Sequence, residues 1–308
     1  MEAKERKRLL ILDCNSIIHR AYHALPPLTT ANGEVVNAVY GFLLVFFKAL
    51  NDFSPDYIAA AFDFPAPSFR QKVFKPYKAK RPSAPPELYS QIPKTKEVLC
   101  AFKVPVFEKE GFEADDIIGT VARFAQKQQV LPFLETIIVS GDKDMLQLVD
   151  KNTKVYLLRK GVKDIIIYEE KQVRQAFGGL EPRQLLDYKA LRGDPSDNIP
   201  GVTGIGEKTA TELLLSCGDV ERLYATLEGR DLACADKIKP KTKELLLRYK
   251  EQAMISRQLA AITKDIPLDF KLEDCRWGFY STEEVYKTLK AMEFSSLLAR
   301  VPEPKQKE

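Results

Sequence analysis

The chain alternates between short apolar runs and longer segments whose apolar residues recur at helical spacing. Five apolar runs predict strands, at residues 9–12, 57–62, 136–139, 155–158 and 165–168. Helical spacing predicts helices between them, at residues 39–50, 92–102 and 115–128. Strands that alternate with helices form parallel sheets with helices on both faces. The first part of the chain is therefore predicted to be an α/β domain.

Two regions break this alternation. Residues 65–93 are rich in proline and lack a long apolar period, so they predict an exposed insertion. Beyond about residue 180 the strand pattern stops, and short helices are predicted at residues 184–191, 208–215, 241–249 and 283–293. The sequence predicts a core at residues 7–178, with an insertion at about 65–95, followed by a helical lobe at residues 179–262. A segment at residues 263–300 then returns to the core, and residues 301–308 form a tail.

Composition places the chain among ordinary globular proteins. Its 308 residues, 45% of them hydrophobic, suffice for a large core. No apolar stretch approaches the roughly 20 residues that span a bilayer, and the charged N-terminus lacks the apolar middle of a signal peptide. We therefore expect a soluble, cytoplasmic protein with no membrane contact. The five cysteines are dispersed without a CxxC pair, which argues against a disulfide framework and a zinc site.

The balance of charge differs between the acids that form motifs and the rest of the chain. The formal net charge is +4, from 47 Lys and Arg against 43 Asp and Glu. Setting aside the nine acids of the motifs described below leaves a clearly basic body. A basic body around an acidic pocket suits a protein that holds a polyanion against metal ions, although an ordinary solvated surface would explain the same numbers.

Three of the predicted strands run into an aspartate. Asp13, Asp63 and Asp142 follow the first three strands, and Asp144 comes two residues after Asp142. One such aspartate is usually a helix cap or a turn residue. The carboxyl ends of parallel strands meet at one edge of the sheet, however, so these carboxylates would repel one another unless cations neutralised them. Because no histidine or cysteine cluster accompanies them, oxygen ligands for Mg²⁺ or Mn²⁺ are predicted.

Five more acids occur in two motifs. Glu113, Asp115 and Asp116 open a predicted helix and precede an apolar pair. The helix dipole explains one or two acids there but explains three less well, and the apolar neighbours indicate a partly buried site. Asp194 and Asp197 lie in a proline-containing turn, where three-residue spacing can point both carboxylates one way. That turn alone is a weak signal, because the same residues are good turn formers.

Two further segments have the chemistry of nucleic-acid contacts. Residues 69–81 are basic, interleaved with aromatic residues and free of acids. Cations attract phosphates and aromatic rings stack on unpaired bases, although a solvated loop is the plainer alternative. Residues 201–208 form a glycine-rich turn between two predicted helices, where the backbone can approach a phosphate closely. Such a turn is as often purely structural.

Together these motifs resemble the 5′–3′ exonuclease domain of bacterial DNA polymerase I, part of the flap endonuclease superfamily. The resemblance runs from about residue 9 to residue 298, with the motifs in family order. It rests among others on Leu-Asp-Cys-Asn-Ser at 12–16, Glu-Ala-Asp-Asp-Ile-Ile-Gly at 113–119, Ser-Gly-Asp-Lys-Asp at 140–144 and Gly-Asp-Pro-Ser-Asp-Asn-Ile-Pro-Gly at 193–201. It implies a PIN-like parallel-sheet nuclease core with helices on both faces and a helix-hairpin-helix (H3TH) lobe.

The resemblance also implies a role for each acid by position. A first metal cluster is expected at Asp13, Asp63, Glu113 and Asp115. A second cluster is expected at Asp142, Asp144, Asp194 and Asp197, with Asp116 shared between the two. The family usually has glycine after the first aspartate, where this chain has Cys14. A side chain at that position would crowd the backbone or tune the site.

The DNA contacts implied by the resemblance lie in two segments. The basic insertion corresponds to an arch or clamp in which Lys78 and Arg81 reach the scissile phosphate, with Arg20 nearby. Further DNA-binding residues are expected in the arch and in the glycine-rich hairpin, namely Arg70, Tyr77, Lys80, Gly201, Gly204, Gly206 and Lys208. The hairpin is expected to grip the duplex backbone without reading sequence, and a K⁺ ion is expected on its carbonyls.

The resulting hypothesis is a 5′–3′ exonuclease and flap endonuclease that cuts DNA by a two-metal-ion mechanism in primer removal and repair. We expect two or more Mg²⁺ ions, replaceable by Mn²⁺, and a monomer that acts on 5′ ends, flaps, nicks and RNA primers on DNA. Two alternatives stay open: a DNA-junction binding module with impaired catalysis, and a ribonuclease with a similar acidic core. The sequence does not distinguish a stand-alone exonuclease from a fragment of a polymerase I.

Overall fold

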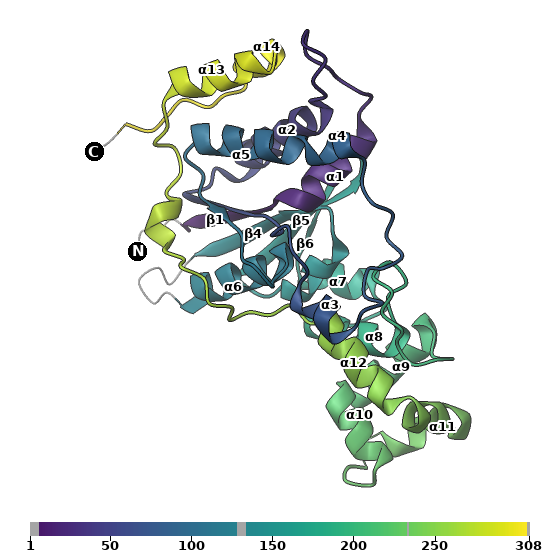
Figure 1. The fold of residues 1–308 in the computed structure, drawn as a ribbon. Helices are drawn as coiled ribbons and strands as arrows, with labels where there is room; N and C mark the ends of the chain where they lie inside the picture. Colours follow the sequence, from purple (N-terminus) through teal and green to yellow (C-terminus); the bar gives the residue numbers. More distant parts are fainter. Residues whose placement is uncertain (1–5, 128–133, 233, 307–308) are drawn as a thin grey trace, which may run out of the picture.

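A six-stranded sheet forms the centre of the computed structural model, which describes residues 6–127, 134–232 and 234–306 (Figure 1). The strand order is β3-β2-β1-β4-β5-β6, and every neighbouring pair is parallel except β5 with β6. The strands are β1 (Arg8–Asp13), β2 (Tyr57–Ala61), β3 (Val106–Phe107), β4 (Glu135–Ser140), β5 (Thr153–Lys160) and β6 (Asp164–Tyr168). The five strands predicted from the apolar runs are confirmed.

Both faces of the sheet are buried, which explains why the strands are apolar without alternation. In β1, Leu9 and Ile11 pack into the core on one face, whereas Leu10 and Leu12 pack into the core on the other. The edges were less predictable. β3 is too short to give an apolar run, and the antiparallel direction of β6 follows from a tight turn that no periodicity reports.

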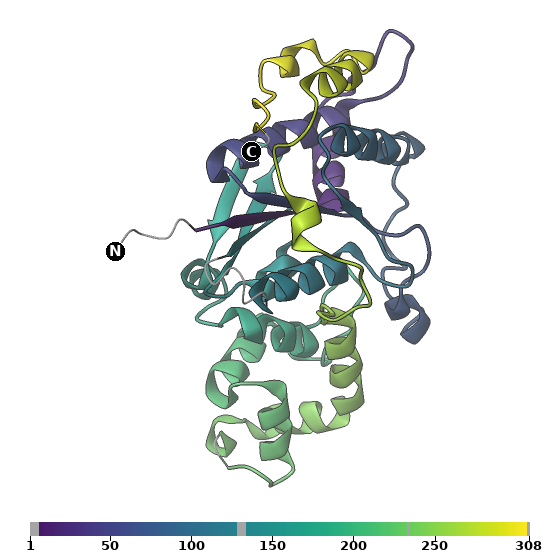
Figure 2. The same ribbon diagram turned by 90° about the vertical axis from the view of Figure 1, so that its left-hand side faces the viewer.

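Helices cover both faces of the sheet, as predicted (Figures 1 and 2). One face is covered by α1 (Cys14–Ala24), α2 (Asn37–Phe53), α4 (Pro86–Tyr89) and α5 (Gln91–Ala101). The other is covered by α6 (Ala114–Lys127) and α7 (Glu170–Ala176). The last residue of the predicted helix 115–128 lies outside the described residues. Within those residues, no helix is both long enough and apolar enough to cross a bilayer.

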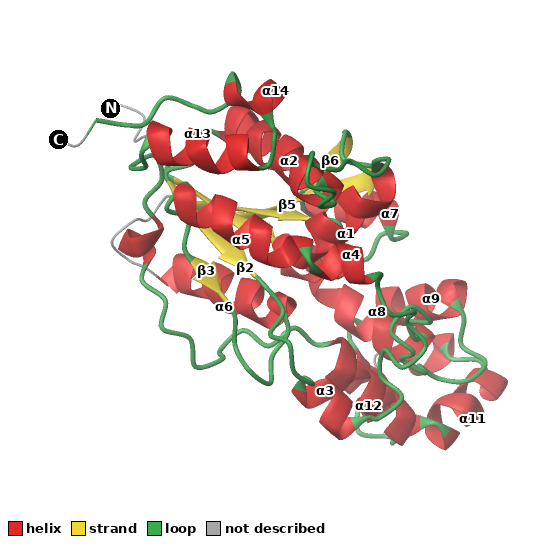
Figure 3. Cartoon of the chain, turned by 45° about the horizontal axis from the view of Figure 1, so that its top comes forward, coloured by secondary structure: helices red, strands yellow, loops and turns green. Residues whose placement is uncertain are grey.

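A purely helical lobe follows the sheet (Figure 3). It contains α8 (Leu185–Arg192), α9 (Glu207–Cys217), α10 (Val220–Leu227), α11 (Pro240–Arg248) and α12 (Lys250–Ala260). Its apolar residues belong to the same core as α6 and one face of the sheet, so the lobe is packed continuously with the sheet domain. The predicted helices 184–191, 208–215 and 241–249 correspond to α8, α9 and α11.

The chain then returns past the sheet to the opposite layer (Figure 2). Trp277 lies among the rings of Phe46, Phe102 and Tyr280, at centroid distances of 5.2 to 5.9 Å. Beyond it, α13 (Thr282–Ala291) and α14 (Ser295–Leu298) pack against the layer that contains α2 and α5. The aromatic cluster thus fastens the end of the described chain to its first helices.

The proline-rich insertion is less exposed than predicted. It contains α3 (Phe69–Val73), and Ser68, Arg70, Tyr77 and Leu88 are all buried. The sequence analysis missed this because Arg70 and Tyr77 are buried by polar contacts with distant segments, and polar contacts leave no apolar period.

The dispersed cysteines, which argue against a disulfide framework, nevertheless include one bonded pair, because Cys217 and Cys234 form a disulfide. Cys217 ends α9, and Cys234 follows α10 after a loop. The packing of α9 against α10 brings the two sulfurs together, and their spacing of 17 residues carries no recognisable sequence signature.

Gly201 offers a test of the lobe's packing. It has φ of +64°, and a Cβ atom there would lie 2.2 Å from the amide nitrogen of Gly193. Gly201→Ala should therefore lower the free energy of unfolding by about 1–3 kcal/mol or more, measured by thermal or urea unfolding. Gly206→Ala is the matched control, because nothing lies within 4 Å of its Cβ position and its φ is negative. Equal destabilisation by both variants would contradict this account.

Candidate active site

Parallel strand register brings three aspartates to one edge of the sheet. Asp13 ends β1 and pairs with Ala61 at the end of β2, so that Asp63 follows just beyond. On the other side of β1, Asp142 follows Ser140, the last residue of β4. The Ser140 hydroxyl donates to Asp13 Oδ2 (2.5 Å) and accepts from the Asp142 amide (2.8 Å), which holds the two strand ends together.

The N-terminus of α6 approaches the same edge. The amide of Ala114 donates to Asp63 Oδ1 over 2.8 Å, so the acid that follows β2 caps the start of the helix. This contact carries Glu113 and Asp115 to the strand ends. A pocket of about 390 Å³ lies between them, lined mainly by polar and charged side chains, among them Asp13, Asp63, Lys78, Arg81, Glu113, Asp115 and Asp142.

A second pocket, of about 520 Å³, adjoins the first. Arg20 and Asp142 line both pockets. The Arg20 guanidinium donates to the carbonyl of Gly141 over 2.9 Å and to the carbonyl of Arg159 over 3.0 Å. The second pocket also contains Asp144, Lys189, Arg192 and Asp194. The structure thus brings most of the sequence-predicted acids into two neighbouring groups, with Asp142 and Arg20 at their boundary.

Three acids of these pockets resist ionisation. Burial, together with the charges of Asp142 and Asp63, raises the pKa of Asp13 to about 6. Burial, together with Asp142 and Asp13, raises the pKa of Asp115 well above its ordinary value. Burial and Asp142 also raise the pKa of Asp144 to about 6. Each shift is the free-energy cost of holding carboxylates together out of water, and a cation among them would reverse it.

Basic side chains neutralise the remaining acids. Lys78 Nζ lies 2.8 Å from Glu113 Oε2. Burial opposes ionisation of Glu113, but the charges of Lys78 and Arg70 and the hydrogen bonds from Lys78 and Ser68 together lower its pKa. Arg81 pairs with Asp197. Lys189 Nζ contacts Asp144 and lies 2.7 Å from Asp194, whose pKa it lowers to about 2 against the effect of burial.

Within the described residues, no three Asp, Glu, His or Cys side chains are arranged so that one metal ion would be bound by all of them. The donor set nevertheless fits divalent cations with oxygen ligands. It consists of carboxylates, three of which have raised pKa values because burial and neighbouring carboxylates disfavour their charged forms.

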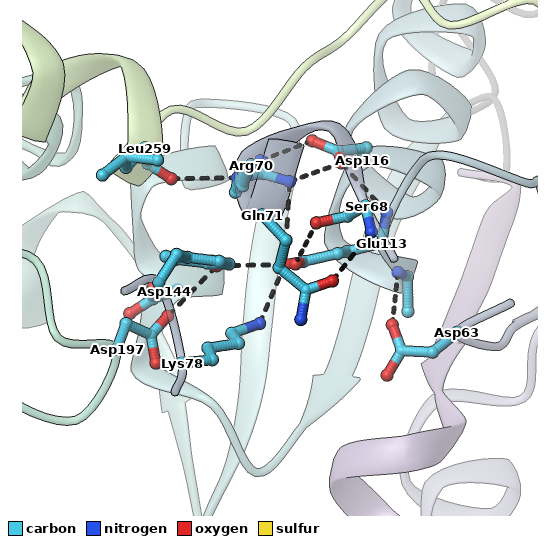
Figure 4. A network of polar contacts seen from close by, with 12 residues as sticks. Asp63, Ser68, Arg70, Gln71, Lys78, Glu113, Asp116, Asp144, Asp197 and Leu259 are labelled. Atoms are coloured by element: carbon cyan, nitrogen blue, oxygen red, sulfur yellow. Dashed lines mark hydrogen bonds and ion pairs between the residues drawn. The ribbon is translucent and has the colours of Figure 1, made fainter. Parts of the chain in front are cut away.

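Two of the predicted ligand and DNA residues have other partners (Figure 4). Arg70, expected on DNA, is 2% exposed and forms a bidentate ion pair with Asp116, both bonds being 2.7 Å long. Asp116, expected to be shared between metal clusters, is fully buried and lines neither pocket. The sequence motif does not show that each residue has the other as its partner, and their roles on DNA and metal stay predictions.

Tyr77 is likewise not available for stacking on a base in this structure. It is 3% exposed, and its hydroxyl contacts Glu113 Oε2 at 3.1 Å and Asp197 Oδ2 at 3.3 Å. Lys80, in contrast, is exposed, as a DNA contact must be. Cys14 packs into the core on the far side of the acids, so the side chain that replaces the family's glycine does not enter either pocket.

The predicted hairpin connects α8 with α9. Gly201 is buried, its amide bonded to Ser256 Oγ and its carbonyl to Gln252 Nε2, both on α12. Gly204, Gly206 and Lys208 are exposed around the first turn of α9. The amides of that turn have no partner within the helix, which is the usual basis of phosphate binding at a helix N-terminus.

Lys189 is the main site residue that sequence reasoning missed. It lies on α8, five residues before Asp194, in a segment predicted only as a helix. A lysine on a helix ordinarily faces solvent, and only the packing of α8 against the sheet edge turns this one inward. Ser140, Ser16 and Asn15 were missed as well, since short polar residues beside an aspartate are common in turns.

Comparison with protein families identifies both halves of the chain. Residues 8–178 match the 5′–3′ exonuclease N-terminal resolvase-like domain, and residues 180–283 match the 5′–3′ exonuclease C-terminal SAM fold. DNA polymerase I of Bacillus subtilis (strain 168) is 41% identical over 299 residues, which are 97% of this chain and 33% of that protein. DNA polymerase I of Caldicellulosiruptor bescii is 42% identical over 298 residues, with 96% and 33% covered. The chain spans about a third of the length of these curated relatives.

Solved structures share the fold. T5 5′-exonuclease with bound zinc ions has a TM-score of 0.65 at 17% identity, over 93% of this chain and 98% of that one. The catalytic core of Rad2 in complex with DNA substrate has a TM-score of 0.56 at 15% identity, over 94% and 88%. Such identities establish the architecture alone, whereas the family models cover most of the sequence itself. The chain therefore belongs to the 5′–3′ exonuclease family.

Proposed function

We propose that this chain is a divalent-metal-dependent 5′–3′ exonuclease and flap endonuclease that hydrolyses DNA phosphodiester bonds by a two-metal-ion mechanism, in primer removal during replication and in repair. The observation that carries the proposal is the convergence of Asp13, Asp115 and Asp142 at one sheet edge, where burial and repulsion raise the pKa values of Asp13 and Asp115. A cluster of this kind serves no purpose in a core and suits cations that bind phosphate.

Eight acids are proposed to hold two or more Mg²⁺ ions, for which Mn²⁺ would substitute. The first group is Asp13, Asp63, Glu113 and Asp115, and the second is Asp142, Asp144, Asp194 and Asp197. When bound, the ions supply a more acidic water as nucleophile and stabilise charge on the phosphate. The remaining chemistry falls to the side chains of the chain itself.

Lys78 and Arg81 are proposed to bind the scissile phosphate, with Arg20 beside them. Burial alone would lower the pKa of Lys78, but Glu113 and Asp115 outweigh it and raise that pKa, so its amine stays protonated. It therefore acts as a fixed positive charge and not as a base. Exchange of its contact from Glu113 to phosphate would free that carboxylate for metal, which couples DNA binding to assembly of the site.

The hairpin and the first turn of α9 are proposed to grip the duplex, with a K⁺ ion on the hairpin carbonyls. Amides and Lys208 would contact phosphates, which gives binding without sequence readout. The substrates are proposed to be DNA with 5′ ends, flaps or nicks, including RNA primers on DNA, and the enzyme is proposed to act as a cytoplasmic monomer.

Removal of a single central carboxylate should separate binding from catalysis. Asp115→Asn or Asp142→Asn should reduce cleavage of a labelled flap in Mg²⁺ by about 100-fold or more, because each lines the first pocket, while affinity for the flap is kept. Asp269→Asn, which changes an exposed acid outside the pockets, is the control. Normal cleavage by both pocket variants would refute the site, and cleavage absent from the unaltered protein would favour a junction-binding module.

Because the acids repel one another, the stability of the metal-free protein should depend on pH. The pKa of Asp13 rises from 3.8 to about 6 on folding, so the folded state binds this proton more tightly and loses stability as pH rises between those values. Asp13→Asn removes that loss. In EDTA, the melting temperature of the variant relative to the unaltered protein should therefore increase from pH 4 to pH 7. The difference reports Asp13 together with its repulsion of Asp115, because the charge of Asp13 helps to raise the pKa of Asp115.

At neutral pH, Mg²⁺ should reverse this difference in melting temperature. The ion stabilises only a protein that binds it, and Asp13→Asn lacks one of the proposed ligands. A difference that shrinks between pH 4 and pH 7 in EDTA would contradict the repulsion argument.

Lys208 tests the duplex grip. Lys208→Gln should weaken binding to duplex-containing substrates of any sequence and reduce the slope of log K against log salt by about 1. Lys171→Gln, an exposed lysine on α7, is the control. An unchanged salt slope for Lys208→Gln, measured by fluorescence anisotropy, would exclude a phosphate contact.

A further inference from the structure

The buried ion pair between Arg70 and Asp116 joins segments that are far apart in the sequence. Arg70 lies on α3, at the foot of the basic insertion, and Asp116 lies in the first turn of α6. Arg70 Nη1 and Nη2 each donate to one carboxylate oxygen over 2.7 Å. Arg70 is 2% exposed and Asp116 is not exposed at all, so water competes with neither.

Each partner is also satisfied by the backbone. Arg70 Nε donates to the carbonyl of Leu259 (2.9 Å) and Nη2 to that of Ala261 (2.5 Å), at the C-terminal end of α12. These carbonyls lack partners within the helix, and a cation is favourable at that end. Asp116 accepts from the amide of Thr263 (2.8 Å), in the segment that leaves α12.

The same pair holds the residues that line the first pocket. The amide of Glu113 donates to Asp116 Oδ2 over 3.1 Å, which fixes the backbone just before α6. Arg70 Nη1 lies 3.6 Å from Glu113 Oε2, beside Lys78 and the Ser68 hydroxyl (Figure 4). The backbone that carries Glu113 and Asp115 is therefore held by a pair that itself lines neither pocket.

We infer that Arg70 and Asp116 are positioning residues that hold Glu113 and Asp115 in register with the opposing strand ends and fasten the foot of the insertion to α12. In this role neither residue would contact metal or DNA. The inference rests on the proposed function, because it assigns the pair a task within that site. Since α12 also bonds the hairpin through Gln252 and Ser256, the pair links the acids to the proposed duplex grip as well.

Three variants test the pair: Arg70→Gln, Asp116→Asn and the double variant that carries both. The double variant removes both charges together, so it tests the inference even if a single variant leaves an unpaired buried charge and fails to fold. Arg70→Lys keeps the positive charge but cannot form the bidentate hydrogen bonds to Asp116. Glu135→Gln is the structural control, because Glu135 pairs with Arg8 and Lys154 at the far end of the sheet.

Flap cleavage at saturating Mg²⁺ should fall by about 10- to 100-fold in kcat for Arg70→Gln and Asp116→Asn alike, with little change in KM. The double variant should lose no more than the worse single variant, because the pair acts as a unit. Arg70→Lys should lose less than Arg70→Gln. Glu135→Gln should lower the melting temperature without lowering kcat at 25 °C.

Two readouts do not depend on cleavage. Mn²⁺ binding, followed by electron paramagnetic resonance, should weaken to the same extent in all three variants. Limited proteolysis of the metal-free protein should cut residues 69–81 faster in each of them than in the unaltered protein or the control. Both readouts remain informative if the unaltered protein cuts no flap, so failure of the proposed function is distinguishable from failure of the pair.

Several outcomes would overturn the inference. Weaker Mn²⁺ binding in Asp116→Asn alone would make Asp116 a ligand. A raised KM and a reduced salt slope in Arg70→Gln alone would make Arg70 a DNA contact. Lowered melting temperatures with unchanged kcat, as in the control, would reduce the pair to a structural role.

Discussion

Electrostatic repulsion among carboxylates is the constraint on which this structure depends. Parallel strands deliver Asp13, Asp63 and Asp142 to one edge, and α6 adds Glu113 and Asp115 to them. Burial, together with repulsion from neighbouring carboxylates, disfavours ionisation and raises the pKa values of Asp13 and Asp144 to about 6. The surrounding fold must therefore be stable enough to hold groups that would otherwise separate.

The chain moderates this repulsion with its own cations, a solution that differs from reliance on metal alone. Lys78, Arg81 and Lys189 each contact an acid of the site. Two of these cations come from the basic insertion, the segment proposed to hold phosphate. Exchange of these contacts for metal and DNA would let substrate binding and site assembly support each other, since each frees partners that the other needs.

Arg70 and Asp116 are inferred to position residues of the site although neither of them lines its pockets. Their charges cancel in a buried bidentate pair, whose remaining hydrogen-bonding capacity is filled by the end of α12 and the start of α6. Such a pair contributes modestly to net stability compared with apolar packing, but it is specific in geometry. This property suits a joint between the insertion, the acids and the helical lobe.

The sequence by itself determined the strands, most long helices and the acids at the strand ends, because apolar periodicity and residue type report burial and local chemistry directly. The resemblance supplied the family. Only the tertiary structure decided the antiparallel edge strand, the disulfide between Cys217 and Cys234 and the inward direction of Lys189. It also decided that Arg70, Tyr77 and Asp116 are buried in polar contacts. Partners from distant segments leave no periodic trace, so pairings of this kind follow from packing and not from local pattern.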